Sequence, residues 1–130
     1  MRTIAVVVLV MLTGCTPTDF ERWRGAACDG DPKAFWALVS QSEIQEALAV
    51  ALVEDGDAKG KLADVAAERA WESMREVWDD DVRRGKDGDL CAMKADGAPS
   101  ESGEQRVTRK SGKPATLRFR GGKLVSYRAR

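Results

Sequence analysis

The residues best able to do chemistry in this chain are its three cysteines, Cys15, Cys28 and Cys91. Once Cys15 is set aside, Cys28 and Cys91 form an even pair, and such a pair in an exported domain most simply forms a disulfide. That bridge would close a loop of about 60 residues and stabilise the fold by about 4 kcal/mol. A redox pair or a pair of metal ligands is the alternative, but the chain has no Cys-x-x-Cys spacing and no histidine.

Cys15 is set aside because it ends a short apolar run at the N-terminus. Arg2 supplies a positive charge, residues 4–12 are continuously apolar, and the small residues Thr13 and Gly14 precede the cysteine. Nine apolar residues are too few to span a bilayer, which needs about 20 in a helix. The pattern is that of a secretory signal with its cleavage site.

The segment Leu12-Thr13-Gly14-Cys15 resembles the bacterial lipoprotein signal, in which the cysteine is acylated and everything before it is removed. The resemblance implies a removed signal peptide at residues 1–14, a lipidated N-terminus and short tether at 15–17, and one globular domain at 18–130. It also implies a cell-envelope protein held to a membrane by lipid on Cys15, which is stable anchoring when two or more acyl chains are attached.

Thr16 follows Cys15 where some lipoproteins have Asp. In enteric-type lipoproteins this implies delivery to the outer membrane, facing the periplasm. An ordinary signal peptide with an incidental cysteine is the alternative interpretation. Export in either form makes nucleic acid a poor candidate partner.

Side chains for acid–base or metal chemistry are few. The absence of histidine removes the usual general base and most zinc sites. Asp79-Asp80-Asp81 offers oxygens for a hard cation, but consecutive helical residues diverge, so a solvated helix end is the simpler interpretation. Gly121-Gly122-Lys123 lacks phosphate-loop spacing and is typical of a hairpin turn. The sequence predicts no catalytic residue, no metal site and no cofactor, and favours a non-enzymatic protein.

Three tryptophans in the helical half, Trp36, Trp71 and Trp78, are the candidate lining of an apolar pocket. Trp71 and Trp78 are seven residues apart, two turns along one helix. A ligand pocket between helices and sheet would make the protein a small apolar-ligand carrier or an enzyme. Packing of these rings in the core is the favoured alternative.

Charge is divided unevenly between the two halves of the chain. Residues 105–130 contain nine basic residues and no acidic one, although the whole chain has 21 of each. One interpretation is that basic strands pack beside acidic helices and the charges largely cancel. The other is that a strand face meets an anionic envelope surface or another envelope protein. The candidate contacts for that surface are Arg118, Arg120, Lys123 and Arg128.

Hydrophobic periodicity predicts an α+β fold of three to four helices followed by an antiparallel sheet of three to four strands. Helices are expected at about 18–27, 33–39, 42–54 and 62–83, the third opened by a capping box at Ser42. The last should bury one stripe of side chains: Leu62, Val65, Ala66, Ala70, Met74, Val77 and Trp78. Strands are expected at 90–93, 105–109, 115–120 and 123–129.

This order of elements distantly resembles small exported domains of the NTF2-like or cystatin-like superfamily. The residues that carry the resemblance are the helix start at residues 30–35 and the closing strand-turn-strand at 117–127. The sequence therefore predicts a lipid-anchored envelope domain that binds a partner or a surface, or assembles with another envelope protein, and names no ligand.

Overall fold

The computed structural model describes residues 16–56 and 59–129, and in them four α-helices precede a four-stranded antiparallel sheet, confirming the α+β prediction. The signal segment, Cys15 and Arg130 lie outside the described residues. The helices are α2 (Asp19–Cys28), α3 (Pro32–Ala37), α4 (Gln41–Glu54) and α5 (Lys61–Arg83), with a 3₁₀ turn η1 (Gly85–Asp87) after the last. None of the helices in this part of the chain is long and apolar enough to cross a membrane.

Side-chain caps begin the first two helices where the sequence predicts them. The Thr18 hydroxyl oxygen accepts the backbone N–H of Glu21 at 3.2 Å, and the Asp31 carboxylate accepts that of Ala34 at 3.2 Å. Pro32 then occupies the first position of α3, where its missing N–H costs nothing. Each cap satisfies a backbone donor that the helix leaves unpaired.

The helix α3 ends at Ala37, not at Val39 as predicted, and a turn at Leu38 leads to Val39. Val39 forms a parallel bridge with Leu124 in the last strand. Leu38 accepts a backbone hydrogen bond from Leu124 at 2.8 Å, and Ser40 donates one to it at 2.9 Å. This pairing satisfies the backbone N–H and C=O of Leu124 on the edge strand of the sheet. It also makes Ser40 the N-cap of α4, two residues before the predicted cap at Ser42.

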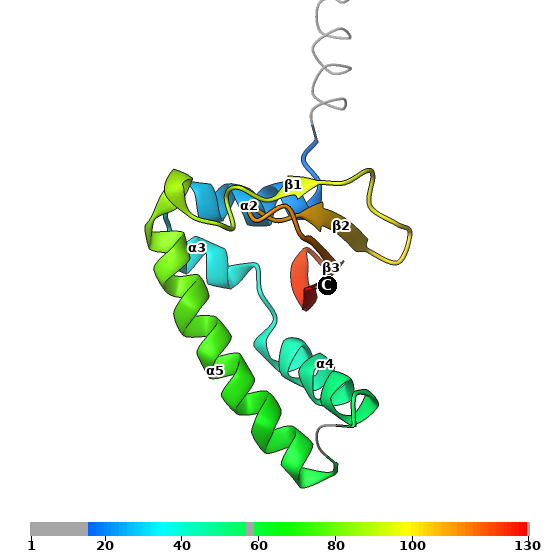
Figure 1. Ribbon diagram of the computed structural model, residues 1–130. Helices are drawn as coiled ribbons and strands as arrows, with labels where there is room; N and C mark the ends of the chain where they lie inside the picture. The colour runs from blue at the N-terminus through cyan, green and yellow to red at the C-terminus, as the bar shows by residue number, and fades with distance from the viewer. Residues whose placement is uncertain (1–15, 57–58, 130) are drawn as a thin grey trace, which may run out of the picture.

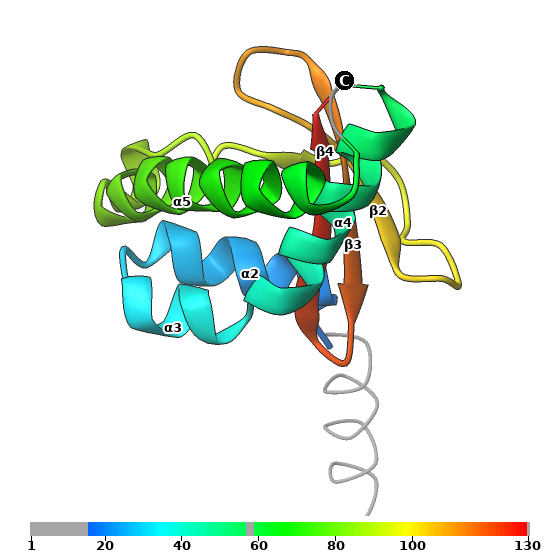
Figure 2. The ribbon, with the colours of Figure 1, turned by 90° about the horizontal axis from the view of Figure 1, so that it is seen from below.

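The sheet is a simple meander of β1 (Lys94–Ala95), β2 (Glu104–Thr108), β3 (Pro114–Arg120) and β4 (Lys123–Ala129), in that order. Val107 pairs with Ala115 and Leu117 pairs with Tyr127, so alternate side chains face the helices. The predicted strand at residues 90–93 is wrong: those residues form a turn, and β1 follows it. Figure 2 shows α2 and α5 side by side against one side of the sheet.

A single hydrophobic cluster joins the helices to the sheet, with Trp23 near its centre. The fully buried Trp23 ring lies 5.4 Å from Phe35, 5.7 Å from Trp78 and 6.2 Å from Phe119, measured between centroids. The contacts with Trp78 and Phe119 are edge-to-face and the contact with Phe35 is tilted, and such ring pairs add to the stabilisation from burial. The disulfide predicted between Cys28 and Cys91 is present, and it fastens the end of α2 to the turn before β1.

The predicted buried stripe of α5 is mostly wrong. Leu62 is 72% exposed and Val77 is 63% exposed. Ala66 and Met74 are half-buried and Ala70 is exposed; of the stripe only Trp78 is buried. The buried residues of this helix are Ala63, Ala67, Trp71, Trp78, Asp81 and Val82. Trp78 belongs to both stripes, so the difference lies in Trp71: the helix is rotated to bury this indole, a large apolar side chain that the predicted stripe leaves exposed.

Candidate functional site

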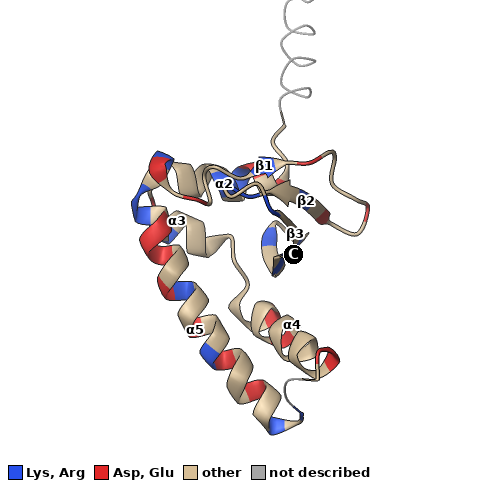
Figure 3. Cartoon of the chain, viewed as in Figure 1, with Lys and Arg blue, Asp and Glu red and all other residues tan. Residues whose placement is uncertain are grey.

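Three of the four predicted anion contacts are paired within the protein. The Arg118 guanidinium lies 2.6 Å from Glu104, that of Arg120 lies 2.9 Å from Glu43, and that of Arg128 lies 3.2 Å from Glu54. These pairs line a hollow of about 410 Å³ between α4 and the β3–β4 strands. Basic strands therefore lie beside acidic residues of α4 and β2, and their charges are locally offset (Figure 3).

Lys123, the fourth predicted contact, is exposed at the start of β4 and lines neither of the two hollows described here. A single exposed lysine attracts an anionic surface by only about 1 kcal/mol. Among the four predicted contacts on β3 and β4, only Lys123 is therefore left to attract an anionic surface.

The three tryptophans pack against neighbours in the core. Trp36 and Trp71 have centroids 5.7 Å apart, and Trp78 contacts Tyr127 at 5.2 Å. Neither of the two hollows is lined by any of these rings. Their positions match the core-packing interpretation, in which the indoles stabilise the fold.

Within the run Asp79-Asp80-Asp81, the first and third carboxylates have separate structural roles. Asp79 accepts the Trp36 indole N–H at 3.0 Å and the Arg83 Nε–H at 2.9 Å. Asp81 is buried and accepts the backbone N–H groups of Asp89 at 2.6 Å and Leu90 at 2.9 Å. Asp79 and Asp81 are therefore bonded within the fold, and the expected solvated helix end is wrong for these two residues. In residues 16–56 and 59–129, no group of three or more acidic or cysteine side chains has the arrangement of a metal site.

The largest hollow described lies between α4 and α5, and we call it the α4–α5 groove. It encloses about 900 Å³ and is open to solvent. The residues that line it are Gln41, Gln45, Glu46, Ala49, Val50, Val53, Glu54, Gly60, Ala63, Asp64, Ala67 and Glu68. Its volume lies at the upper end of the range for ligand pockets.

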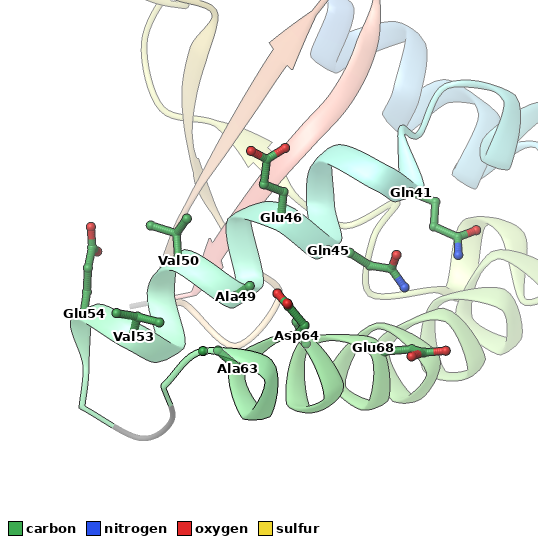
Figure 4. Close-up of a pocket in the computed structure, with 12 residues that line it drawn as sticks. Gln41, Gln45, Glu46, Ala49, Val50, Val53, Glu54, Ala63, Asp64 and Glu68 are labelled. Carbon is green, nitrogen blue, oxygen red and sulfur yellow. The ribbon is translucent and has the colours of Figure 1, made fainter.

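Alanines on both helices bring the two elements close and form the groove floor. Ala63 and Ala67 are almost fully buried, while Ala49 is partly covered. Figure 4 shows Ala49 and Val53 of α4 facing Ala63 across the groove. Small residues at these positions let helix backbones approach closely at one end, and the helices diverge from there (Figure 1).

Exposed apolar side chains and carboxylates border this floor. Val53 is 50% exposed and faces the floor, whereas Val50, 51% exposed, points away from α5 (Figure 4). Asp64 rises from α5 toward α4, Glu68 extends along the α5 edge, and Glu46 leaves α4 on the side away from α5 (Figure 4). The described lining contains four carboxylates and no Lys or Arg.

Sequence reasoning missed the α4–α5 groove. The signal was present in α4, because Val50 and Val53 do not belong to the stripe that starts at Ile44 and continues through Leu48. An apolar residue outside the buried stripe of a helix is exposed unless another element covers it. Comparison with models of known protein families, with curated proteins and with solved structures finds no match for this chain.

Proposed function

We propose that this protein is a lipid-anchored component of the bacterial cell envelope, a non-catalytic domain that binds another protein through the α4–α5 groove. The observation that carries the binding role is the groove itself: an open hollow of about 900 Å³ with the half-exposed Val53 beside an alanine floor. Exposed apolar surface that is continuous and edged by polar residues is typical of interaction sites.

Two features support the location. The Leu12-Thr13-Gly14-Cys15 signal supports acylation of Cys15, and Thr16 after it favours the outer membrane. The Cys28–Cys91 disulfide supports an oxidising compartment outside the cytoplasm. With α2 beginning at Asp19, the tether from Cys15 is only about 10–15 Å long when extended.

The position of the groove is compatible with such an anchor. Residues 16–18 and the ends of α4 and α5 that meet lie on opposite sides of the molecule in both views (Figures 1 and 2). A domain held close to the lipid by Cys15 would turn the α4–α5 groove away from the membrane. A protein in the periplasm could then reach it.

Fractionation of cells tests the anchor. The native protein is expected in the outer-membrane fraction and to incorporate a labelled fatty acid, whereas the Cys15→Ser variant is expected in the soluble envelope fraction without label. Cys28→Ala/Cys91→Ala, which leaves Cys15 intact, is the control and should keep its label and its membrane location. An unlabelled native protein, or a Cys15→Ser variant that fractionates as the native protein does, contradicts the lipid anchor.

A further inference from the structure

The charge and shape of the α4–α5 groove restrict what can occupy it. Apolar contacts are available on the alanine floor and at Val53, which faces α5 (Figure 4). Of the four lining carboxylates, Glu54 is paired with Arg128, and for Glu46, Asp64 and Glu68 the described residues provide no ion-pair partner. The neighbouring lysines Lys59 and Lys61 lie outside the lining. An occupant therefore meets an apolar strip bordered by Asp64 and Glu68, which have no ion-pair partner among the described residues.

Two occupants are disfavoured by this charge. Anionic lipid headgroups carry the same sign as the groove, so a membrane surface is repelled. A second copy joined by a two-fold axis would place the same patch on both sides. The carboxylates of the two copies would then face one another, which costs free energy.

The shape of the groove favours a helix. Its α4 side runs from Gln41 to Val53, about 18 Å at ~1.5 Å per residue. That length matches about three turns of a partner helix lying between α4 and α5. Apolar side chains at i, i+3, i+4 and i+7 of such a helix would contact the floor, and basic side chains on its flanks would reach Asp64 and Glu68.

We infer that the α4–α5 groove receives a cationic amphipathic helix of a partner protein. This inference rests on the proposed function and adds the chemistry of the partner. Charge complementarity speeds the encounter and sets the specificity, while the apolar contacts supply most of the affinity. Binding through the groove should therefore weaken, but not vanish, as salt concentration rises.

Three synthetic peptides test the inference against the full chain carrying Cys15→Ser, which separates groove binding from membrane anchoring. Each is an amphipathic helix of about 14 residues with leucine at the same i, i+3, i+4 and i+7 positions. The other positions are lysine in the first peptide, glutamine in the second and glutamate in the third. Calorimetric titration is expected to show binding in the order lysine, glutamine, glutamate, with the lysine peptide at least about tenfold tighter than the glutamate peptide.

Charge reversals on α5 locate the binding site. Asp64→Lys/Glu68→Lys should weaken binding of the lysine peptide about tenfold, because two attractions become repulsions. The matched control is Glu76→Lys/Asp80→Lys on the same helix, which makes the same change in net charge outside the groove, beginning about 12 Å along the helix from Glu68. That control should change the affinity less than about twofold, since exposed charges farther than a Debye length are screened. Val53→Ser, which leaves the charge unchanged, should weaken all binding.

The possible outcomes separate the inference from the proposed function. If the glutamine or glutamate peptide binds as tightly as the lysine peptide and Val53→Ser weakens it, the groove binds helices but the cationic partner is wrong. Equal losses in the two α5 double variants show nonspecific attraction and overturn the inference. If no peptide binds, both the groove as a binding site and the cationic partner are overturned. If the native protein self-associates and the Asp64→Lys/Glu68→Lys variant is monomeric, the groove is occupied by a second copy of this chain. That outcome overturns the inference of a cationic partner protein.

Discussion

The indole N–H of Trp36 donates a 3.0 Å hydrogen bond to the Asp79 carboxylate, linking α3 to the last turns of α5. The other oxygen of Asp79 accepts the Arg83 Nε–H, so the carboxylate connects two helices and one cation. The Arg75 guanidinium carbon lies 5.7 Å from the Trp36 ring centroid, a cation–π contact between the same two helices. These contacts hold α3 in place over α5 although α3 has only six residues.

Stability should depend on the ionisation of Asp79. The Trp36 hydrogen bond, together with Arg83, holds the pKa of this carboxyl below its ordinary value. Because the folded state favours the ionised carboxylate, Asp79 stabilises the fold fully at pH values above its unfolded-state pKa, near 3.9. This stabilisation is lost as the pH falls through the lower pKa of the folded state. We expect Asp79→Asn to cost about 1 kcal/mol in the free energy of unfolding at neutral pH. The gap from the native protein should close as the medium becomes acidic.

Chemical denaturation at a series of pH values measures this gap. Asp80→Asn is the matched control at neutral pH, because Asp80 is exposed and surface substitutions stay within about 0.5 kcal/mol. A gap between Asp79→Asn and the native protein that stays constant into acid contradicts the role of the charged carboxylate. Equal losses in the two variants at neutral pH also contradict it.

Gly88 and Gly25 should respond to alanine with opposite signs. A Cβ at Gly88 would lie 2.6 Å from the Asp81 carbonyl oxygen, in the turn that leads to Cys91, whereas a Cβ at Gly25 meets nothing within 4 Å. We expect Gly88→Ala to destabilise the fold by about 1–3 kcal/mol. Gly25→Ala, inside α2, should stabilise it by about 0.5–1 kcal/mol, because glycine is a poor helix former. Thermal unfolding compares the two variants, and a shift of the same sign in both would contradict the placement of these residues.

The disulfide should be a major source of stability. Cys28 and Cys91 are 63 positions apart in the sequence, and a loop of that size corresponds to about 4 kcal/mol on the chain-entropy model. Cys28→Ala/Cys91→Ala should lose that amount in denaturant unfolding without reductant. A reductant should lower the native protein to the level of the double variant and leave the variant unchanged. A native protein insensitive to reductant under unfolding conditions would falsify the structural role of the bridge.

Local chemistry made much of the fold predictable from sequence. Thr18, Asp31 and Pro32 mark helix starts because their preferences act within one turn of the chain. The alternation around Leu117 predicted β3 because one face of that strand is buried and the other is not. The cysteine pair predicted the bridge because two cysteines without Cys-x-x-Cys spacing, in a chain without histidine, leave few alternatives to a disulfide.

Features that depend on contacts distant in sequence were not predictable in this way. Val39 leaves the helix only because Leu124, in the last strand, pairs with it. The acidic partners of the basic strands, such as Glu43 for Arg120, lie 77 positions away and become visible only in the fold. The α4–α5 groove depends on how two helices diverge, which no periodicity within either helix determines. The same applies to the rotation of α5.

The rotation of α5 can be tested with two valines on that helix. Val77 is 63% exposed and Val82 is fully buried, although the predicted stripe contained Val77 and not Val82. Val82→Ala should cost about 2 kcal/mol, because it removes two buried carbon atoms and leaves a cavity. Val77→Ala should be neutral or stabilise by about 0.5 kcal/mol, since alanine is the better helix former. Denaturant unfolding of both variants checks this, and a larger loss at Val77 would support the predicted stripe instead.

Tyr127 gives an optical test of the core at alkaline pH. It is the only tyrosine in the chain, and its ring stands at 90° to Trp78. Burial raises the pKa of its hydroxyl above the ordinary 10, although the nearby Arg109 guanidinium acts in the opposite direction. The folded protein thus favours the neutral phenol, so this contribution to stability is complete below pH ~10 and is lost as pH rises through the folded pKa. Phenolate absorbance should therefore appear at higher pH in the folded protein than in the protein unfolded by denaturant. As pH rises above ~10, the Tyr127→Phe variant should lose less stability than the native protein does, because it has no phenol to ionise. Coincident phenolate titrations in the two states would show that Tyr127 is solvated and does not pack against Trp78.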